Sequence, residues 1–300
     1  MNEESDFISQ LISQAKNNDL TESFNKEIKH GETKIQSIVP VTSKDIKGFE
    51  TYTFLDDKFG DIKGIPYASN NILVGLPNSG KSLLLQDIAL NVSEKNKKVL
   101  YILSEEIFNS DGKRNDINMR LTKKIETKNM NIKNISENLI VLDTVKYSQY
   151  RIWENFVNAY RDIVESKGIE LVLIDSLTLL EDNRAQLKNK LLELIRYNQT
   201  HNLTSIIVNQ RTVEESDNLN MSGGISLSHL VDSVFILDYK KVWSGDAQMK
   251  QDMNVKQGET VNFFRILKSR LSKYEAKYFQ YTISEDGFII LLDNVGEEIN

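Results

Sequence analysis

From about residue 48 onward, short runs of apolar residues alternate with segments in which apolar residues recur every three or four positions. The runs predict buried strands, and the periodic segments predict helices with one apolar face. The strands are expected at 71–74, 98–103, 139–142, 171–174, 205–208 and 234–237, and the helices at 83–92, 152–163 and 187–195. This alternation predicts an α/β fold with a mostly parallel central sheet and helices on both faces.

The pattern changes toward the C-terminus, where the apolar runs 260–267, 278–283 and 288–292 follow one another with short connections and no helical segment between them. Ser284-Glu-Asp-Gly287 separates the last two runs and has the composition of a hairpin turn. Strands joined by such short turns pair antiparallel. We therefore expect a C-terminal antiparallel extension of the same sheet.

The N-terminal region differs from the rest of the chain. Its apolar residues with helical spacing, which predict a short amphipathic helix, are Phe7, Ile8, Leu11, Ile12 and Ala15. The region is too small to bury a core of its own. It is therefore a helix packed on its own domain, an arm that docks on a neighbouring subunit, or a disordered segment. We divide the chain into an N-terminal arm at 1–47 and one domain at 48–300.

The amino-acid composition limits the possible chemistry. The chain has 300 residues, of which 40% are hydrophobic and 27% are charged, so a sizeable core beneath a polar surface is expected. It contains no cysteine, which excludes disulfides, thiol catalysis and cysteine metal sites. Its three histidines are too few for a histidine metal centre without help from carboxylates.

Charge and hydropathy limit the possible partners. With a formal net charge of -6, any contact with nucleic acid must use a local patch or a surface built at subunit junctions. The N-terminus is acidic and has no long apolar core, so no signal peptide is expected. No apolar run approaches the ~18 residues that cross a bilayer. These features, with the lack of cysteine, favour a cytoplasmic protein without membrane contact.

A phosphate-binding loop follows the predicted strand at 71–74. Gly75-Leu-Pro-Asn-Ser-Gly-Lys-Ser82 matches the pattern G-x-x-x-x-G-K-[ST], with a strand before it and a helix after it. Its backbone N–H groups would face phosphate oxygens, with Lys81 reaching the β- and γ-phosphates and Ser82 binding Mg²⁺. The residues expected to contact the nucleotide are Gly75, Leu76, Pro77, Asn78, Ser79, Gly80, Lys81, Ser82 and Leu83.

Acidic residues end two other predicted strands. Asp175 follows the run 171–174, and it would hold Mg²⁺ through Ser82 or through water, because ligands bind at the carboxyl edge of open α/β sheets. Glu105 and Glu106 follow the run 98–103. One of these two carboxylates could orient or deprotonate the attacking water, with Glu105 as the first choice and Glu106 as the second. The alternative is a solvated pair at the start of a loop.

Taken together, residues 48–292 resemble the RecA superfamily of ATPases, specifically the group that contains RecA, RadA and KaiC. The segments that carry the resemblance are Val99-Leu-Tyr-Ile-Leu-Ser-Glu-Glu106, Asn209-Gln210, Gly223-Gly224 with Leu227, His229 and Val231-Asp232, Phe263-Phe-Arg-Ile-Leu-Lys-Ser-Arg270, and Phe279-Gln-Tyr-Thr-Ile-Ser-Glu-Asp-Gly-Phe288. The first looks like the strand that ends in the catalytic glutamate of RadA and KaiC. The resemblance implies a RecA-like ATPase domain at 48–300 that binds ATP with Mg²⁺.

The resemblance also implies further roles. Gln210 looks like the glutamine with which RecA senses the γ-phosphate, so it could report hydrolysis to the loop at 211–222. Lys268 and Arg270 resemble the Lys-x-Arg element of RadA, KaiC and hexameric helicases, which reaches the nucleotide of the neighbouring subunit and would neutralise transition-state charge there. This implies a homo-oligomer, either ring or filament, with nucleotide sites at subunit junctions. The alternative is two solvated charges on an edge strand.

Some features depart from these families. The chain has no N-terminal cysteine zinc module and no C-terminal protease-like domain, which bacterial RadA carries, and no second ATPase copy, which KaiC has. The loop at 211–222 contains one basic residue, Arg211, against Glu214, Glu215 and Asp217, whereas recombinase DNA loops usually look more basic. The basic segment at 109–133 could compensate for this loop, or it is a solvated helix.

Three functions are compatible with these motifs. The first is an ATPase that acts on DNA as a ring or filament, in recombination, repair or replication. The second is a KaiC-like switch, in which ATP controls assembly and the docking of protein partners. The third is a P-loop kinase for a small molecule, which ranks last because it leaves Gln210, Lys268 and Arg270 without a role.

Overall fold

The structure of this chain is a computed structural model that describes residues 47–111, 116–177, 184–210 and 227–292. The predicted arm at 1–47, apart from its last residue, lies outside the described residues. The predicted loop at 211–222 and the Gly223-Gly224 pair also lie outside them.

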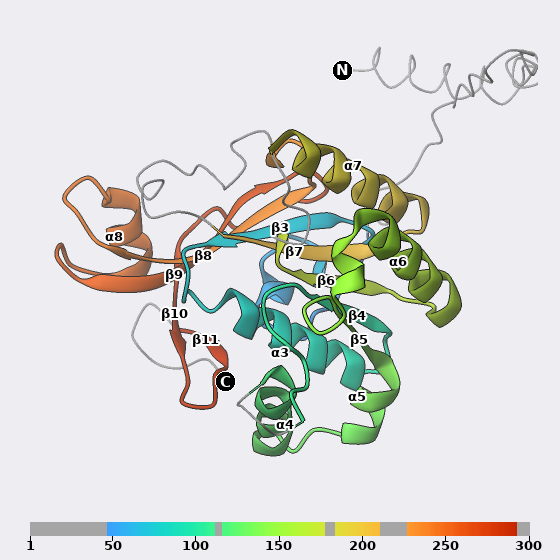
Figure 1. Cartoon of the computed structure of the whole chain (residues 1–300). Coiled ribbons are helices and arrows are strands. Elements are labelled where there is room, and N and C mark those ends of the chain that lie inside the picture. The colour runs from blue at the N-terminus through green and yellow to red at the C-terminus, as the bar shows by residue number, and fades with distance from the viewer. Residues whose placement is uncertain (1–46, 112–115, 178–183, 211–226, 293–300) are drawn as a thin grey trace, which may run out of the picture. The chain divides into compact units, whose positions relative to one another are not determined.

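A nine-stranded sheet runs through the described part of the chain. Its parallel strands are β3 (Asn70–Gly75), β4 (Val99–Leu103), β5 (Leu139–Asp143), β6 (Leu171–Asp175), β7 (Thr204–Gln210) and β8 (Ser233–Lys241). Its antiparallel strands are β9 (Thr260–Ser269), β10 (Phe279–Ile283) and β11 (Ile289–Leu291). The strands lie in the order β11-β10-β9-β8-β3-β7-β6-β4-β5 (Figure 1). The predicted mostly parallel sheet and its antiparallel C-terminal extension are both confirmed.

Helices cover both faces of this sheet, as predicted (Figure 1). One face carries α6 (Trp153–Lys167) and α7 (Arg184–Thr200), and the other carries α3 (Lys81–Glu94), α4 (Ile117–Thr127) and α5 (Ile132–Asn138). Apolar periodicity did not predict the short elements, which are η2 (Phe54–Asp57), η3 (Ser148–Arg151), α8 (Ala247–Met253) and the pair β1 (Gly48–Phe49) and β2 (Ile65–Pro66). Helix α8, for example, buries only Met249 and Met253, which is too few positions to show a period. None of the helices formed by the described residues has the length and hydropathy of a membrane-spanning helix.

The central strands are buried on both of their faces. In β3, Ile72 belongs to the apolar cluster beneath α6 and α7, whereas Leu73 belongs to the cluster beneath α3. In β4, Leu100 and Tyr101 divide between the two clusters in the same way. Successive side chains of a strand point to opposite faces, so a strand covered on both sides needs an unbroken apolar run. This requirement explains the runs from which the strands were predicted.

The predicted hairpin turn lies between β10 and β11. The Gly287 N–H donates to the carbonyl oxygen of Ser284 at 2.9 Å, and the Ser284 N–H donates to the carbonyl oxygen of Phe288 at 2.9 Å. Gly287 has φ +81°, in the left-handed region that glycine adopts without strain. The turn composition therefore predicted this connection correctly.

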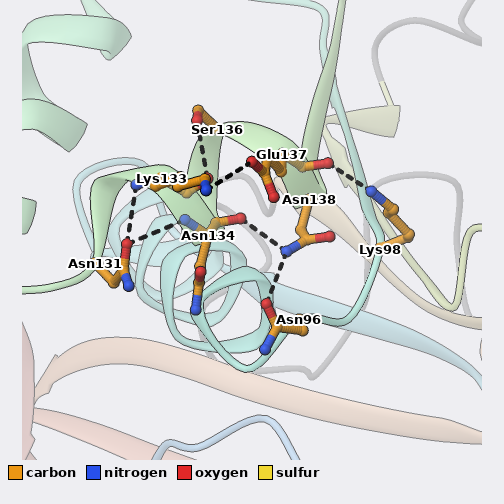
Figure 2. A network of polar contacts seen from close by, with 8 residues as sticks. All are labelled: Asn96, Lys98, Asn131, Lys133, Asn134, Ser136, Glu137 and Asn138. Atoms are coloured by element: carbon orange, nitrogen blue, oxygen red, sulfur yellow. Dashed lines mark hydrogen bonds and ion pairs between the residues drawn. The ribbon is translucent and has the colours of Figure 1, made fainter.

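Helix α5 is short and is held at both ends by asparagine side chains (Figure 2). Asn131 Oδ1 caps its first turn, while Asn138 Nδ2 donates to Asn96 Oδ1 at 3.5 Å, beyond the end of α3. Lys98, just before β4, donates from Nζ to the carbonyl oxygen of Glu137 at 2.6 Å. The Lys98 bond joins the end of α5 to the residue before β4, the strand that leads to Glu105.

The described part of the basic segment at 109–133 forms α4, the start of α5 and loops, but its lysines do not all face solvent. Lys124 is only 1% exposed, and its Nζ donates to Asp87 Oδ1 at 2.6 Å and to the carbonyl oxygen of Leu83 at 3.3 Å. The other Asp87 oxygen accepts from the Ile289 N–H at 3.3 Å. The alternative of a wholly solvated helix is therefore wrong for Lys124. This pair joins α4 to α3 and to the C-terminal hairpin.

Removal of Lys124 should destabilise the fold strongly. Lys124→Met would leave the buried Asp87 carboxylate without its counter-ion, and we expect a loss of about 3 kcal/mol in the free energy of unfolding, measured in urea. Lys123→Met is the matched control, because Lys123 pairs with Asp286 at 2.9 Å on the surface and should contribute less than about 1 kcal/mol.

A double variant tests the reason for this loss. Lys124→Met combined with Asp87→Leu replaces the ion pair by apolar side chains and should recover most of the lost stability. Equal stabilities of Lys124→Met and Lys123→Met would contradict the importance of the buried pair.

Candidate nucleotide-binding site

The predicted phosphate loop connects β3 to α3 and is pressed against β8. A Cβ atom on Gly75 would lie 1.8 Å from the carbonyl oxygen of Leu237, so only glycine fits at this position. The next N–H, of Leu76, donates to Asp238 Oδ1 at 3.2 Å. Gly80 has φ +89° directly before the first residue of α3. The backbone thus turns sharply from strand to helix, which lets its N–H groups face a bound phosphate.

The loop residues differ in exposure. Leu76, Ser79 and Lys81 are buried, Pro77 and Asn78 are exposed, and Ser82 and Leu83 are half-buried in the first turn of α3. Lys81 Nζ donates to the carbonyl oxygen of Leu76 at 2.6 Å and lies 3.4 Å from Ser79 Oγ. Burial lowers the pKa of Lys81, and neighbouring carboxylates, first among them Asp238, oppose this shift. The ammonium group is therefore held inside the curl of the loop.

Asp175 ends β6 and faces the start of α3. It is 8% exposed, and it accepts hydrogen bonds from Ser82 and from the Tyr101 hydroxyl, the latter at 3.1 Å. Burial raises the pKa of Asp175 to about 6, although both hydrogen bonds act in the opposite direction. A carboxylate buried in this way is stabilised by a nearby cation.

The donors around Asp175 fit Mg²⁺. This ion is usually held by one or two carboxylates together with substrate phosphates, and Asp175 and Ser82 would be the protein ligands here. The described residues contain no cluster of three or more acidic, histidine or cysteine side chains that could hold a metal alone. An Mg²⁺ ion held here by Asp175 and Ser82 would take its remaining ligands from nucleotide oxygens and water.

The two glutamates after β4 have different neighbours. Glu105 accepts from Gln210 Nε2, at 3.1 Å to Oε1 and 3.0 Å to Oε2. Glu106 instead forms an ion pair with Arg120 of α4. The structure therefore brings Glu105, the first choice for the water-activating residue, together with the predicted phosphate sensor, and it places Glu106 against a helix.

Gln210 lies beside the phosphate loop because of strand register. It ends β7 and pairs with Gly75, the last residue of β3. Asp175 likewise pairs with Leu103, two residues before Glu105. Parallel strands in this register bring their carboxyl ends to one edge of the sheet. The predicted loop, metal ligand, glutamate and sensor accordingly gather at that edge.

Lys268 and Arg270 lie at the opposite edge of the same subunit. Lys268 of β9 pairs with Val234 of β8, and Val234 pairs with Ile72 of β3. Ile72 lies three positions before Gly75, which is about 10 Å along the strand. Lys268 Nζ donates to the carbonyl oxygens of Ser228 and Val231, and Arg270 Nη2 donates to that of His229 at 2.6 Å. Arg270 follows the last residue of β9 rather than lying within it. Neither side chain meets the phosphate loop of its own subunit.

Three residues of this edge were not predicted from the sequence. Tyr101 donates to Asp175, Asp238 accepts from the loop, and the Tyr281 hydroxyl donates to the carbonyl oxygen of Ser79 at 2.5 Å. A tyrosine inside a buried strand needs a hydrogen-bond partner, and this was the one available signal for Tyr101. Asp238 and Tyr281 lie far from the loop in sequence, so no local pattern points to them.

A comparison with family models identifies the chain. The model described as "ATPase: KaiC" matches residues 43–295. The chain belongs to the KaiC family of ATPases. The KaiC-family match covers all described strands and helices, including β9, β10 and β11. It agrees with the resemblance to the RecA, RadA and KaiC group.

Individual relatives are more distant. The protein named DNA repair protein RadA of Campylobacter jejuni is 24% identical over 223 residues, which are 71% of this chain and 44% of that protein. The Helicobacter pylori protein of the same name is 25% identical over 193 residues, which are 64% of this chain and 38% of that protein. This KaiC-family chain therefore spans less than half the length of these relatives.

A solved structure shows the same fold. The KaiC-like protein of the archaeon Pyrococcus horikoshii OT3 superposes with a TM-score of 0.61 at 14% sequence identity. The match covers 83% of this chain and all of that protein, 100% of its length. The KaiC-like arrangement of strands and helices is thus present here.

The raised pKa of Asp175 leads to a pH-dependent stability prediction. The unfolded carboxyl ionises near its ordinary value of 3.8, whereas the folded one ionises at about 6. Ionisation therefore destabilises the nucleotide-free fold increasingly from pH 4 to 6 and by a constant amount above that range. Asp175→Asn should be more stable than the unsubstituted chain by about 2–3 kcal/mol at pH 7.5. The two should be equally stable near pH 4.

Urea unfolding across this pH range, without nucleotide, measures the difference. A stability difference that does not change with pH would contradict the burial of an uncompensated carboxylate. Because asparagine has the same shape and keeps one acceptor oxygen for the Ser82 or Tyr101 hydroxyl, the comparison chiefly removes the charge.

Proposed function

We propose that this chain binds ATP with Mg²⁺, hydrolyses it, and acts on DNA in recombination, repair or replication. The main support for hydrolysis is the hydrogen bond from Gln210 to Glu105. This contact lies at the carboxyl edge of the sheet, where Lys81 and Asp175 also lie. A loop that only held a nucleotide would not need a carboxylate at this place. The name of the two RadA relatives supports the DNA part.

The proposed mechanism uses residues at or after the carboxyl ends of β3, β4 and β6. The backbone of the phosphate loop orients the phosphates, and Lys81 neutralises charge on the β- and γ-phosphate oxygens. Glu105 orients a water molecule and accepts its proton as the water oxygen attacks the γ-phosphorus. The bond from the γ-phosphorus to the bridging oxygen breaks, and ADP and phosphate form. Bound Mg²⁺, held by Ser82 and Asp175, would supply further charge neutralisation.

We further propose that the active form is a homo-oligomer, a ring or a filament. Their position supports this proposal, because Lys268 and Arg270 lie at the edge of the sheet away from their own phosphate loop. There they would act as arginine-finger-type cations. A site shared in this way lies at a subunit junction.

A second candidate function is an ATP-dependent switch that binds protein partners rather than DNA. It is favoured by the family match and by the net charge of -6, which repels nucleic acid outside local patches. In this case ATP would control assembly, and turnover would not depend on DNA.

DNA binding distinguishes the two functions. We expect fluorescently labelled single- or double-stranded oligonucleotides to bind in the presence of ATP and Mg²⁺, with affinity that falls as salt rises because phosphate contacts release counter-ions. DNA should also raise ATP turnover. Lys81→Ala, which removes the loop cation, is the control for nucleotide dependence. No binding to either form at low salt, together with DNA-independent turnover, would favour the switch.

A mixing experiment tests the shared site. Arg270→Ala should lower kcat by about 10³-fold, while the Kd for nucleotide changes less than about threefold, because the guanidinium acts on a neighbour. Lys273→Ala, which removes an exposed cation nearby, is the matched control and should leave turnover unchanged. Mixing Arg270→Ala with Lys81→Ala should partly restore activity, since some junctions then combine two intact halves. Normal turnover by Arg270→Ala would contradict the assignment.

A further inference from the structure

Two serines connect the ends of the strands that carry Glu105 and Asp175. The Ser104 N–H donates to the carbonyl oxygen of Asp175 at 2.9 Å, which continues the pairing of β4 with β6 by one residue. Ser104 Oγ then accepts from the Ser176 N–H at 2.7 Å and donates to the carbonyl oxygen of Ser176 at 3.1 Å. A single hydroxyl thus binds both backbone groups of the residue after Asp175.

The second serine reaches the glutamate. Ser176 is 1% exposed, and its hydroxyl donates to Glu105 Oε1 at 2.5 Å. The Gln210 amide contacts the same carboxylate from β7. Glu105 itself is exposed, and a free glutamate side chain has many rotamers whose restriction costs entropy. Donors from two different strands reduce that freedom before any nucleotide arrives.

We propose that Ser176 is a positioning residue for Glu105 and that Ser104 positions Ser176. This inference rests on the proposed hydrolysis of ATP. The hydrogen bonds from Ser104 through Ser176 to Glu105 fix the position of the Glu105 carboxylate relative to Asp175. They do so because the same bonds join the residues that follow β4 to the residues at the end of β6. Neither serine is a catalytic residue, since each acts through another group.

The chemistry explains why such a junction matters. A general base works only within hydrogen-bond reach of the water that it deprotonates, and a misplacement of about 1 Å can cost about 10²-fold in rate. Nucleotide affinity depends instead on the phosphate loop, whereas the Ser176 hydroxyl donates to the Glu105 carboxylate. Loss of the Ser176 hydroxyl should therefore lower kcat and leave nucleotide binding intact. A serine that merely capped the strand would change stability or would affect both quantities together.

The test compares Ser176→Ala, Ser104→Ala, the double variant and Ser93→Ala in the full chain. Ser93 is a matched control, because it is fully buried and its hydroxyl donates to the Ala89 carbonyl oxygen within α3. ATP turnover gives kcat, a fluorescent ATP analogue gives Kd, and thermal unfolding followed by circular dichroism reports folding.

We expect Ser176→Ala to lower kcat by about 10- to 100-fold with Kd changed less than about twofold, and Ser93→Ala to change neither. Ser104→Ala should give a smaller loss of kcat in the same direction, and the double variant should lose less than the product of the two single losses, because both serines act on one carboxylate.

Several results would overturn the positioning role. They are a kcat of Ser176→Ala within twofold of the unsubstituted chain, a parallel loss of nucleotide affinity, or fully multiplicative losses in the double variant. If Ser176→Ala does not fold, a Ser104→Ala variant that folds and keeps normal kcat overturns the role equally. No turnover by the unsubstituted chain, with nucleotide still bound, would overturn the proposed hydrolysis itself and the serine roles with it.

Discussion

The in-register pairing of parallel strands is the constraint on which the candidate site depends. β3 pairs with β7 so that Gly75 lies opposite Gln210, and β4 pairs with β6 so that Leu103 lies opposite Asp175. The phosphate loop, Glu105, Asp175 and Gln210 each lie at or shortly after the carboxyl end of such a strand. A slip of one residue in either pair would turn the strand's side chains to the wrong face of the sheet. The two apolar cores on the opposite faces therefore also fix the geometry of the site.

The same sheet explains the asymmetry of the domain. The carboxyl ends of β3, β4, β6 and β7 lead into the phosphate loop, Glu105, Asp175 and Gln210, whereas β8 and β10 support the loop from the other side. β8 contributes the Leu237 carbonyl and the Asp238 carboxylate, and β10 contributes the Tyr281 hydroxyl. Helix α4 adds the buried Lys124–Asp87 pair, which connects the helix after the loop to the C-terminal hairpin. Contacts from β8, β10 and α4 thus stabilise the phosphate loop and the helix that follows it in this KaiC-family domain.

Much of this arrangement could be predicted from the sequence, because local signals determine it. The runs around 71–74 and 171–174 gave the strands, and the Gly75–Ser82 pattern gave the loop. Prediction failed where a side chain's partner is distant in sequence. Lys124 looks like its neighbouring lysines, and its partner Asp87 is 37 residues away in another helix. Glu105 was preferred to Glu106 from the sequence, but only the fold shows that Glu105 contacts Gln210 and that Glu106 pairs with Arg120.

The hydrogen bonds of Lys268 and Arg270 have a consequence for assembly. Within one subunit these cations already bind three backbone carbonyl oxygens, those of Ser228, His229 and Val231. If they move to a neighbour's phosphates, they must first give up these bonds, of which the two from Lys268 are partly buried and the one from Arg270 is exposed. The free energy of association would then contain only the difference between the two sets of contacts. Exchange of this kind favours subunits that come together when a triphosphate is present and separate readily once it has gone.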